Sequence, residues 1–293
     1  MNQQEPPSPK ADQGPPTLAV VAIAKNERRD IEGFVGHLQN WVDEIVVVDD
    51  YSTDGTYEFL NSCGNKVKVF QRGLERENGG FAAQRNAGLA EAKADWILHM
   101  DVDERVTPEL AAEIRKAIVT DQYNAFRYHR LNFFLHRPFN AGGWQSWNAA
   151  QLGRKGKHQF SGAIHEAVEV DGGQDRIGQL TSTMWHLNDD SYVERMYKNA
   201  HYAQYSADEI SQTGKPVGWR QLLFVPMYRA FKSYFLRGAW RHGETGLLFS
   251  LYVFAGTFNW YAIAWDRQKQ IPRQQIEESL QQKWRQWRAE NEA

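Results

Sequence analysis

The sequence is poor in cysteine and has no excess of charge of either sign. Its 293 residues include one cysteine, Cys63, so no disulfide can form within the chain and we expect a reduced, cytosolic setting. The 34 basic and 36 acidic residues nearly cancel, leaving a formal net charge of −2. No global field therefore favours nucleic acid, which we do not expect as a partner.

Several ligand-binding motifs are also missing. No Gly-x-Gly-x-x-Gly follows the first apolar run, and no Gly-x-x-x-x-Gly-Lys-Ser/Thr occurs, which argues against dinucleotide and P-loop sites. An EF-hand beginning at Asp101 fails, because Val106 and Ala112 stand where that loop needs glycine and glutamate. The letters HEAVE lack the second histidine of a zinc-protease helix, since Glu169 takes its place.

The first seventeen residues differ in composition from the rest. They carry five prolines, almost no apolar side chains and no apolar signal-like run, so we expect residues 1–17 to be a disordered tail. From Leu18 onward, short apolar runs alternate with segments of helical periodicity. The predicted strands are LAVVAIA (18–24), EIVVVD (44–49), KVKVFQ (66–71) and DWILHM (95–100), with helices between them and another entered through Thr107 and Pro108.

This alternation predicts an α/β fold with a mostly parallel central sheet flanked by helices. The strands are near-continuous apolar runs, as expected for strands covered on both faces. In such sheets ligands bind outside the carboxyl ends of the strands. The segments there read AKNE, DDYSTDG and DVDE, so we expect the chemistry in them.

Carboxylates close two of these strands. If the backbone is still extended, Asp101 and Asp103 point the same way and can share Mg²⁺ or Mn²⁺ with a diphosphate. The alternative is that the run only caps the next helix. Asp49 closes the second strand, where its carboxylate can accept the imide N–H of uracil or cap a turn. Arg85 begins a predicted helix and offers donors to phosphate oxygens, or is simply solvated.

Together and in order, the segments LAVVAIAKNE, VVVDDYSTDGT, FAAQRNAG and ILHMDVDE resemble family 2 glycosyltransferases with the GT-A (Rossmann-like) fold. Within that family the chain is similar to the WaaE-like lipopolysaccharide-core β-glucosyltransferases. The resemblance implies a catalytic domain over residues 18–190, with a nucleotide-sugar half (18–120) and an acceptor half (121–190).

The resemblance also implies roles for individual residues. The uridine pocket would be lined by Ala24, Asn26, Glu27 and Asp49, and Arg85 would approach the diphosphate. Asp101 would face the ribose or the metal, Asp103 would ligate the cation, and His186 would orient the metal or a phosphate unless it is structural.

The catalytic base is a separate assignment. An inverting transfer needs one base to take the proton of the acceptor hydroxyl. The resemblance points to Glu166, with His165 second, although a structural ion pair there is as plausible. The segment around Trp144, Trp147 and Asn148 departs from the family pattern, which leaves the acceptor sugar open.

The carboxy-terminal third is rich in aromatic and basic residues. We expect an amphipathic helix over 222–236 and a charged helix over 271–293. Residues 246–265 are uncharged, which suits a helix lying on, or re-entering, an anionic membrane, whereas a buried hairpin or a dimer contact is the alternative. Between Lys215 and Thr245 one acidic residue, Glu244, is opposed by six basic residues: Lys215, Arg220, Arg229, Lys232, Arg237 and Arg241.

These features predict an inverting hexosyltransferase that moves a sugar, glucose by resemblance, from a UDP-sugar to a lipid-linked or envelope glycan such as lipopolysaccharide core. We expect it in the cytoplasm, peripheral on the inner face of the cytoplasmic membrane, helical over 191–270 and able to oligomerise through its carboxy-terminal helices. A non-catalytic sugar-nucleotide or glycan-binding protein is the alternative. A sugar-nucleotide nucleotidyltransferase is less compatible, because AKNERRD is not its phosphate loop.

Overall fold

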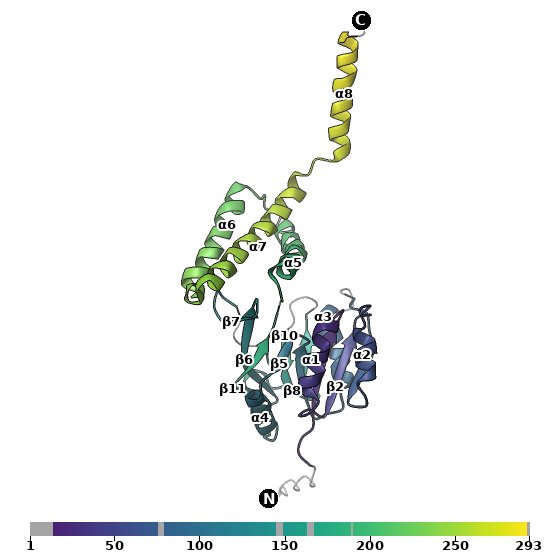
Figure 1. Cartoon of the computed structure of the whole chain (residues 1–293), viewed down its shortest axis with the longest axis vertical. Coiled ribbons are helices and arrows are strands. Elements are labelled where there is room, and N and C mark those ends of the chain that lie inside the picture. Colours follow the sequence, from purple (N-terminus) through teal and green to yellow (C-terminus); the bar gives the residue numbers. More distant parts are fainter. Residues whose placement is uncertain (1–13, 76–78, 145–148, 163–166, 189, 292–293) are drawn as a thin grey trace, which may run out of the picture. The chain divides into compact units, whose positions relative to one another are not determined.

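The computed structural model describes residues 14–75, 79–144, 149–162, 167–188 and 190–291 (Figure 1). The chain divides into two compact units near residue 188, and Ala141–Gly143 belong to the second unit.

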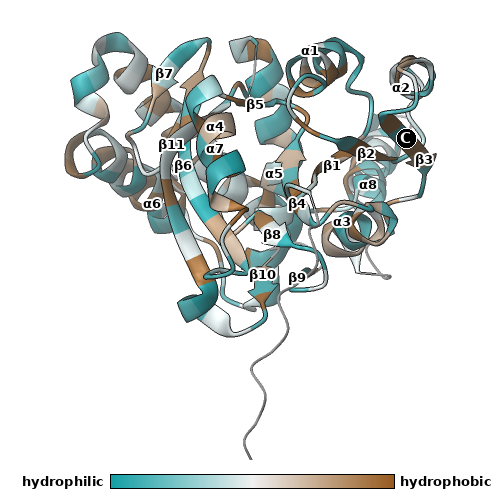
Figure 2. Ribbon diagram, turned by 90° about the horizontal axis from the view of Figure 1, so that it is seen from below, coloured by the Kyte–Doolittle hydropathy of each residue, from teal (hydrophilic) through white to brown (hydrophobic). Residues whose placement is uncertain are grey.

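Four parallel strands form the first half of the sheet in the first unit. They are β1 (Leu18–Ala24), β2 (Glu44–Asp49), β3 (Val67–Gln71) and β4 (Trp96–Asp101), in the spatial order β3-β2-β1-β4. The apolar runs that predicted these strands are buried along β1, β2 and β4, and Figure 2 shows their hydrophobic ribbon at the centre of this unit. The predicted α/β fold is confirmed.

Helices cover both faces of these strands. Helices α1 (Arg28–Leu38) and α2 (Thr56–Ser62) bury Phe34 and Leu60 in the larger apolar cluster on one face. Helix α3 (Gly80–Glu91) packs on the opposite face. A Cβ atom at Gly88 would lie 2.4 Å from Val21 Cγ1, so only glycine lets α3 come this close to β1.

The sheet becomes mixed beyond β4. Strand β8 (Leu152–Arg154) runs antiparallel to β4 and to β6 (Ala125–Phe134), whereas β6 and β11 (Ile177–His186) are parallel. Strand β5 (Glu104–Val106) ends the order β4-β8-β6-β11-β5, and β7 (Arg137–Phe139) pairs with β6. A separate hairpin joins β9 (His158–Ser161) to β10 (Ala167–Val170).

Helix α4 (Pro108–Ala117) begins where the sequence predicts. The Thr107 hydroxyl accepts a hydrogen bond from Leu110 N at 3.3 Å, and Pro108 occupies the first helical position. The acidic run before it is not a continuous strand. Strand β4 ends at Asp101, a turn covers Val102 and Asp103, and β5 begins at Glu104. The condition for Asp101 and Asp103 to point the same way, an extended backbone, is therefore not met.

The second unit is helical. It contains α5 (Tyr192–Gln212), α6 (Trp219–Phe231), a π-helical turn (Lys232–Leu236), a 3-10 turn (Ala239–His242), α7 (Gly243–Lys269) and α8 (Arg273–Asn291). Helix α7 packs against both α5 and α6. A Cβ atom at Gly256 would lie 2.5 Å from Asn199 Nδ2, and Asn259 Nδ2 donates to Asn199 Oδ1 at 3.0 Å, so α5 and α7 are in close polar contact.

Candidate active site

The strand ends bring most of the predicted site residues to one edge of the parallel sheet. In the register of the strands, Ala24 pairs with Asp49. Asp49 pairs with Gln71 on its other side, and Asp101 pairs with Ile23. Register of this kind follows from the parallel order β3-β2-β1-β4, in which the carboxyl ends of neighbouring strands lie side by side.

Asp49 is fully buried at this edge. Its Oδ2 atom accepts hydrogen bonds from Ser52 N at 3.0 Å and from Gln71 Nε2 at 3.1 Å. Its Oδ1 atom is buried and has no hydrogen-bond partner within the described residues. Because an unpaired buried carboxylate oxygen is costly, the atom suits an N–H donor from a ligand.

Asn26 and Glu27 shape the loop after β1. Asn26 has a φ of 57°, its backbone N–H donates to Ser52 Oγ at 2.8 Å, and its Oδ1 accepts from Thr53 N at 2.8 Å. Glu27 N donates to Thr56 Oγ1 at 2.9 Å. These bonds join the loop after β1 to the turn after β2. Asn26 therefore stabilises the loops at the edge of the site.

Arg85 is buried, with 6% of its surface exposed, and is not a solvated helix residue. Its Nη2 atom donates to Asp101 Oδ1 at 2.8 Å. Burial alone would raise the pKa of Asp101, but the Arg85 guanidinium, its hydrogen bond and the nearby Arg130 lower it to about 2. Arg85 is thus the main partner that favours the ionised form of Asp101.

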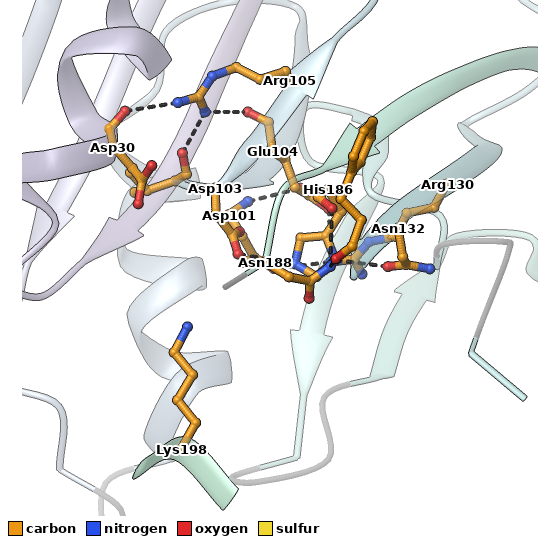
Figure 3. Close-up of polar contacts among 12 residues, drawn as sticks. Asp30, Asp101, Asp103, Glu104, Arg105, Arg130, Asn132, His186, Asn188 and Lys198 are labelled. Carbon is orange, nitrogen blue, oxygen red and sulfur yellow. Dashed lines mark hydrogen bonds and ion pairs between the residues drawn. The ribbon is translucent and has the colours of Figure 1, made fainter. Parts of the chain in front are cut away.

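Asp103 lies in the turn between β4 and β5 and faces His186 at the end of β11. The distance from His186 Nε2 to Asp103 Oδ2 is 3.1 Å. The other ring nitrogen, Nδ1, lies 2.8 Å from Asn132 Oδ1, and Figure 3 shows His186 and Asn132 side by side. The structure therefore brings His186 and Asp103 together as an ion pair.

Glu104 and Arg130 form an ion pair that the sequence did not reveal. Glu104 is fully buried, its Oε1 lies 3.2 Å from Arg130 Nη2, and its Oε2 accepts from Asp101 N at 2.9 Å. Burial and the neighbouring Asp101 carboxylate raise the pKa of Glu104 to about 7. The sequence carried one signal for this ion pair, the charged residue Arg130 inside the aromatic run AFRYHRLNFF. A charge buried in a sheet needs an opposite charge on a neighbouring strand.

Arg105 holds the turn that presents Asp103. Its Nη1 atom donates to Val102 O and Glu104 O, both at 2.7 Å, and its Nη2 donates to Asp30 O on α1 at 3.0 Å (Figure 3). One guanidinium therefore closes the turn and anchors it to the neighbouring helix.

Two buried histidines, His99 and His158, lie near Arg85. His99 on β4 is fully buried, and neither of its ring nitrogens has a hydrogen-bond partner within the described chain. Burial, with the Arg85 and His158 charges, keeps the pKa of His99 well below its ordinary value. Its ring centroid lies 4.3 Å from that of Phe160, so His99 acts here as a neutral packing residue.

Some predicted residues cannot be placed. His165, Glu166, Trp147 and Asn148 lie outside the described residues, so their proposed roles stay predictions. Trp144 is described, and its ring packs edge-on against Phe134 and Phe139, at centroid distances of 6.0 Å and 5.8 Å. That contact agrees with a packing role.

The metal-binding prediction names Asp101, Asp103 and His186. Across the part of the chain that the structure describes, no group of three or more His, Cys, Asp or Glu side chains is arranged to hold a metal ion. Asp103 and His186 form a group of two. The 3.1 Å between their facing atoms is an ion-pair distance, and an imidazole nitrogen and a carboxylate oxygen are both atoms that bind metal ions. The residues thus fit an ion that takes its remaining ligands from a substrate or water.

Comparison with known proteins gives one family match. The model of glycosyl transferase family 2 matches residues 19–173. The chain is 26% identical over 241 residues to the lipopolysaccharide core biosynthesis glycosyltransferase LpsC of Rhizobium meliloti (strain 1021), covering 79% of this chain and 85% of that protein. It is also 26% identical over 257 residues to an uncharacterized glycosyltransferase of Rickettsia felis, covering 81% and 85%.

Solved structures were compared as well. The S. aureus TarS 1-349 crystal structure matches with a TM-score of 0.45 and 15% identity, covering 86% of this chain and 91% of that one. The mannosyltransferase PcManGT from Pyrobaculum calidifontis, in complex with GDP-Man and Mn²⁺, matches with a TM-score of 0.43 and 16% identity, covering 85% of each chain.

Proposed function

Because the chain belongs to glycosyl transferase family 2, we propose that it is an inverting hexosyltransferase that uses a UDP-sugar donor and an envelope glycan or glycolipid acceptor. The observation that carries the proposal is the alignment of Asp49, the Arg85–Asp101 pair and the Asp103–His186 pair at the carboxyl ends of parallel strands and in the turn that follows. Asp49 and each of the two pairs supply a different part of donor recognition.

Asp49 supports a uridine nucleotide. Its unpartnered buried Oδ1 offers an acceptor for the imide N–H of uracil, while Ser52 and Gln71 hold the other oxygen. Ala24, the register partner of Asp49, has only a methyl side chain, and we place it in the wall of the same pocket. We place Asn26 and Glu27 at the rim of the same pocket.

Arg85 and the cation site support the diphosphate. The Arg85 guanidinium, held in place by Asp101, would donate hydrogen bonds to phosphate oxygens. Asp103 and His186 would hold Mg²⁺ or Mn²⁺, with Asp101 facing the ribose or contributing to the same ion. When bound, the cation would offset the charge that grows on the departing nucleoside diphosphate.

We assign the acceptor side by similarity and by chemistry. Glu166 is the proposed base that takes the proton of the acceptor hydroxyl, with His165 as the alternative. The similarity to LpsC supports lipopolysaccharide core as the acceptor class. Glucose is the proposed sugar by the family resemblance of the sequence alone.

The test is UDP release from a panel of UDP-sugars with Mn²⁺ or Mg²⁺ and a lipopolysaccharide-core acceptor. We expect Asp103→Ala and Glu166→Gln to lose at least about 100-fold in kcat. The matched control is Asp121→Ala, because the Asp121 carboxylate is exposed and pairs with Arg154 away from the strand ends. Full activity of Asp103→Ala would refute the cation site, and full activity of Glu166→Gln alone would refute only the base. Donor binding without turnover would favour the non-catalytic binding protein.

The second unit supports attachment to an anionic membrane surface. Within the described residues, one helical segment, Ala239–Lys269, is long and apolar enough to cross a membrane by length and composition. It consists of the 3-10 turn and α7, and 28% of its most apolar stretch is buried within the structure. Its polar contacts with α5, such as Arg195 over the Tyr252 ring at 4.6 Å, favour a helix that lies in a packed layer over one that spans alone.

An exposed aromatic surface lies on α6 and the turns that follow it. The side chains on it are about half exposed, and basic residues lie between them, as on helices that rest at the headgroup boundary. We therefore propose a cytoplasmic protein that is peripheral on the inner face of the membrane, with the carboxy-terminal helices also available for oligomer contacts. The apolar members are Trp219, Phe224, Met227, Tyr228, Phe231 and Phe235.

A further inference from the structure

Asn132 makes a contact that neither the family match nor the proposed function explains. It lies near the end of β6 with 6% of its surface exposed, and it is the register partner of His186 on the parallel strand β11. Its Oδ1 atom lies 2.8 Å from His186 Nδ1. A buried amide side chain therefore meets one ring nitrogen of a histidine whose other nitrogen faces Asp103.

The contact distinguishes the two forms of the neutral histidine ring, because only one of them can donate to Asn132 Oδ1. A carbonyl oxygen can only accept, so Nδ1 must be the N–H donor of this bond. In the neutral imidazole the lone pair is then on Nε2, which is 3.1 Å from Asp103 Oδ2. In the opposite tautomer the hydrogen is on Nε2 and points toward Asp103. That nitrogen then has no lone pair with which to bind a cation beside Asp103.

The strands do not need this bond to stay together. Backbone pairing joins β6 to β11 from Thr183 to His186, and Asn188 Nδ2 donates to Phe133 O at 3.1 Å. The Asn132–His186 bond adds instead a fixed ring orientation. Outer partners of this kind, a carboxylate or carbonyl on the far nitrogen, commonly orient metal-binding histidines.

We propose that Asn132 is a positioning residue that holds His186 in the Nδ1–H form, so that His186 Nε2 and Asp103 can bind one divalent cation together. The inference rests on the cation site of the proposed function. It adds the residue that prepares His186 for the ion before any substrate arrives.

Mn²⁺ binding tests the inference without turnover. Mn²⁺ affinity of the full chain is measured by titration with UDP present, against a protein-free UDP blank. We expect Asn132→Leu, which has no acceptor, to weaken Mn²⁺ binding about 10- to 100-fold, and Asn132→Asp, which keeps one, to stay close to wild type. Asn124→Leu is the matched control, because Asn124 is also buried but bonds to Asp171 O, and we expect its Mn²⁺ affinity to be unchanged.

A second measurement uses the wild-type chain alone. The ¹⁵N NMR pattern of the neutral His186 ring should report a hydrogen on Nδ1, so the test survives if Asn132→Leu does not fold. A hydrogen on Nε2, or equal Mn²⁺ affinity of Asn132→Leu and wild type, overturns the inference and leaves the cation site standing. If wild type and Asp103→Ala both fail to bind Mn²⁺, the cation site and the inference fall together.

Discussion

Arg85 Nη2 and Asp101 Oδ1 lie 2.8 Å apart, joining the first turns of α3 to the end of β4. The pair brings a cation and an anion to the edge where the parallel strands end, and it keeps the Arg85 guanidinium in one orientation. The proposed diphosphate site depends on that orientation, because Arg binds phosphate through a planar set of donors.

Replacing Arg85 tests this dependence. We expect Arg85→Ala to lower kcat/KM for the UDP-sugar by about 10²- to 10³-fold, and Arg85→Lys to recover only part of it, because an ammonium is a point charge without the planar fork. Steady-state kinetics over a range of donor concentrations gives the answer. Equal kcat/KM for Arg85→Lys and wild type would show that the charge alone matters.

His37 should make the folded chain less stable in acid. Its Nε2 accepts from Val106 N at 3.2 Å and its Nδ1 faces Gly33 O, so the ring is held neutral. Burial and the Arg105 charge lower its pKa from 6.5 to about 4. The unfolded state therefore binds more protons between these values, and the stabilisation, complete above pH 6.5, is lost as pH falls toward 4.

The measurement is urea unfolding at several pH values between 4 and 7, for wild type and for His37→Gln. We expect the difference between the two curves to change by at most about 3 kcal/mol, reduced by solvent screening of this partly exposed ring. Glutamine can still accept from Val106 but does not titrate. Parallel curves for the two proteins would contradict the assignment to His37.

Gly88 should tolerate no side chain. In Gly88→Ala the new Cβ would meet Val21 Cγ1 at 2.4 Å and Val48 Cγ2 at 3.2 Å, which would push α3 away from the sheet. We expect a loss of about 1–3 kcal/mol in the free energy of unfolding, and weaker UDP binding because Arg85 moves with α3.

Gly36 provides the matched control. It lies inside α1, and a Cβ there would have no atom within 4 Å. We expect Gly36→Ala to gain about 0.5–1 kcal/mol, since alanine favours helix over glycine. A loss for Gly36→Ala, or no loss for Gly88→Ala, would contradict the packing described for α1 and α3.

The aromatic surface of α6 should carry membrane binding. We expect the triple variant Phe224→Ser, Met227→Ser, Phe231→Ser to lose sedimentation with vesicles that contain anionic lipid, because it removes exposed apolar side chains from the surface. Lys232→Glu should weaken binding to anionic vesicles specifically, and more at low salt. Val119→Ser, an exposed residue of the first unit, should change nothing. A wild-type chain that ignores anionic vesicles would refute membrane attachment.

The first half of the sheet could be predicted closely from local pattern. The strands over 18–24 and 44–49 have the bounds that the apolar runs indicated, and Thr107 caps α4 as expected. The reason is physical: fully buried parallel strands must be continuously apolar, so they stand out, and polar residues reappear where the sheet ends.

The shared orientation of the Asp101 and Asp103 side chains could not be predicted in the same way, because it required an extended backbone between them. The turn at Val102–Asp103 and the ion pair of Asp101 with Arg85 depend on Arg105 reaching Asp30 on α1 and on the packing of α3. Neither contact is visible in a run of four residues.

The sequence by itself determined which strand ends carry acidic and basic groups, because that placement follows from local hydrophobicity. The tertiary structure decided which of these groups meet. Asn132 and His186 are 54 positions apart, and Glu104 meets Arg130 only because β5, β11 and β6 pair in one register. Pairing between distant strands is set by the packing of the whole sheet, and so these partners appeared only in the folded chain.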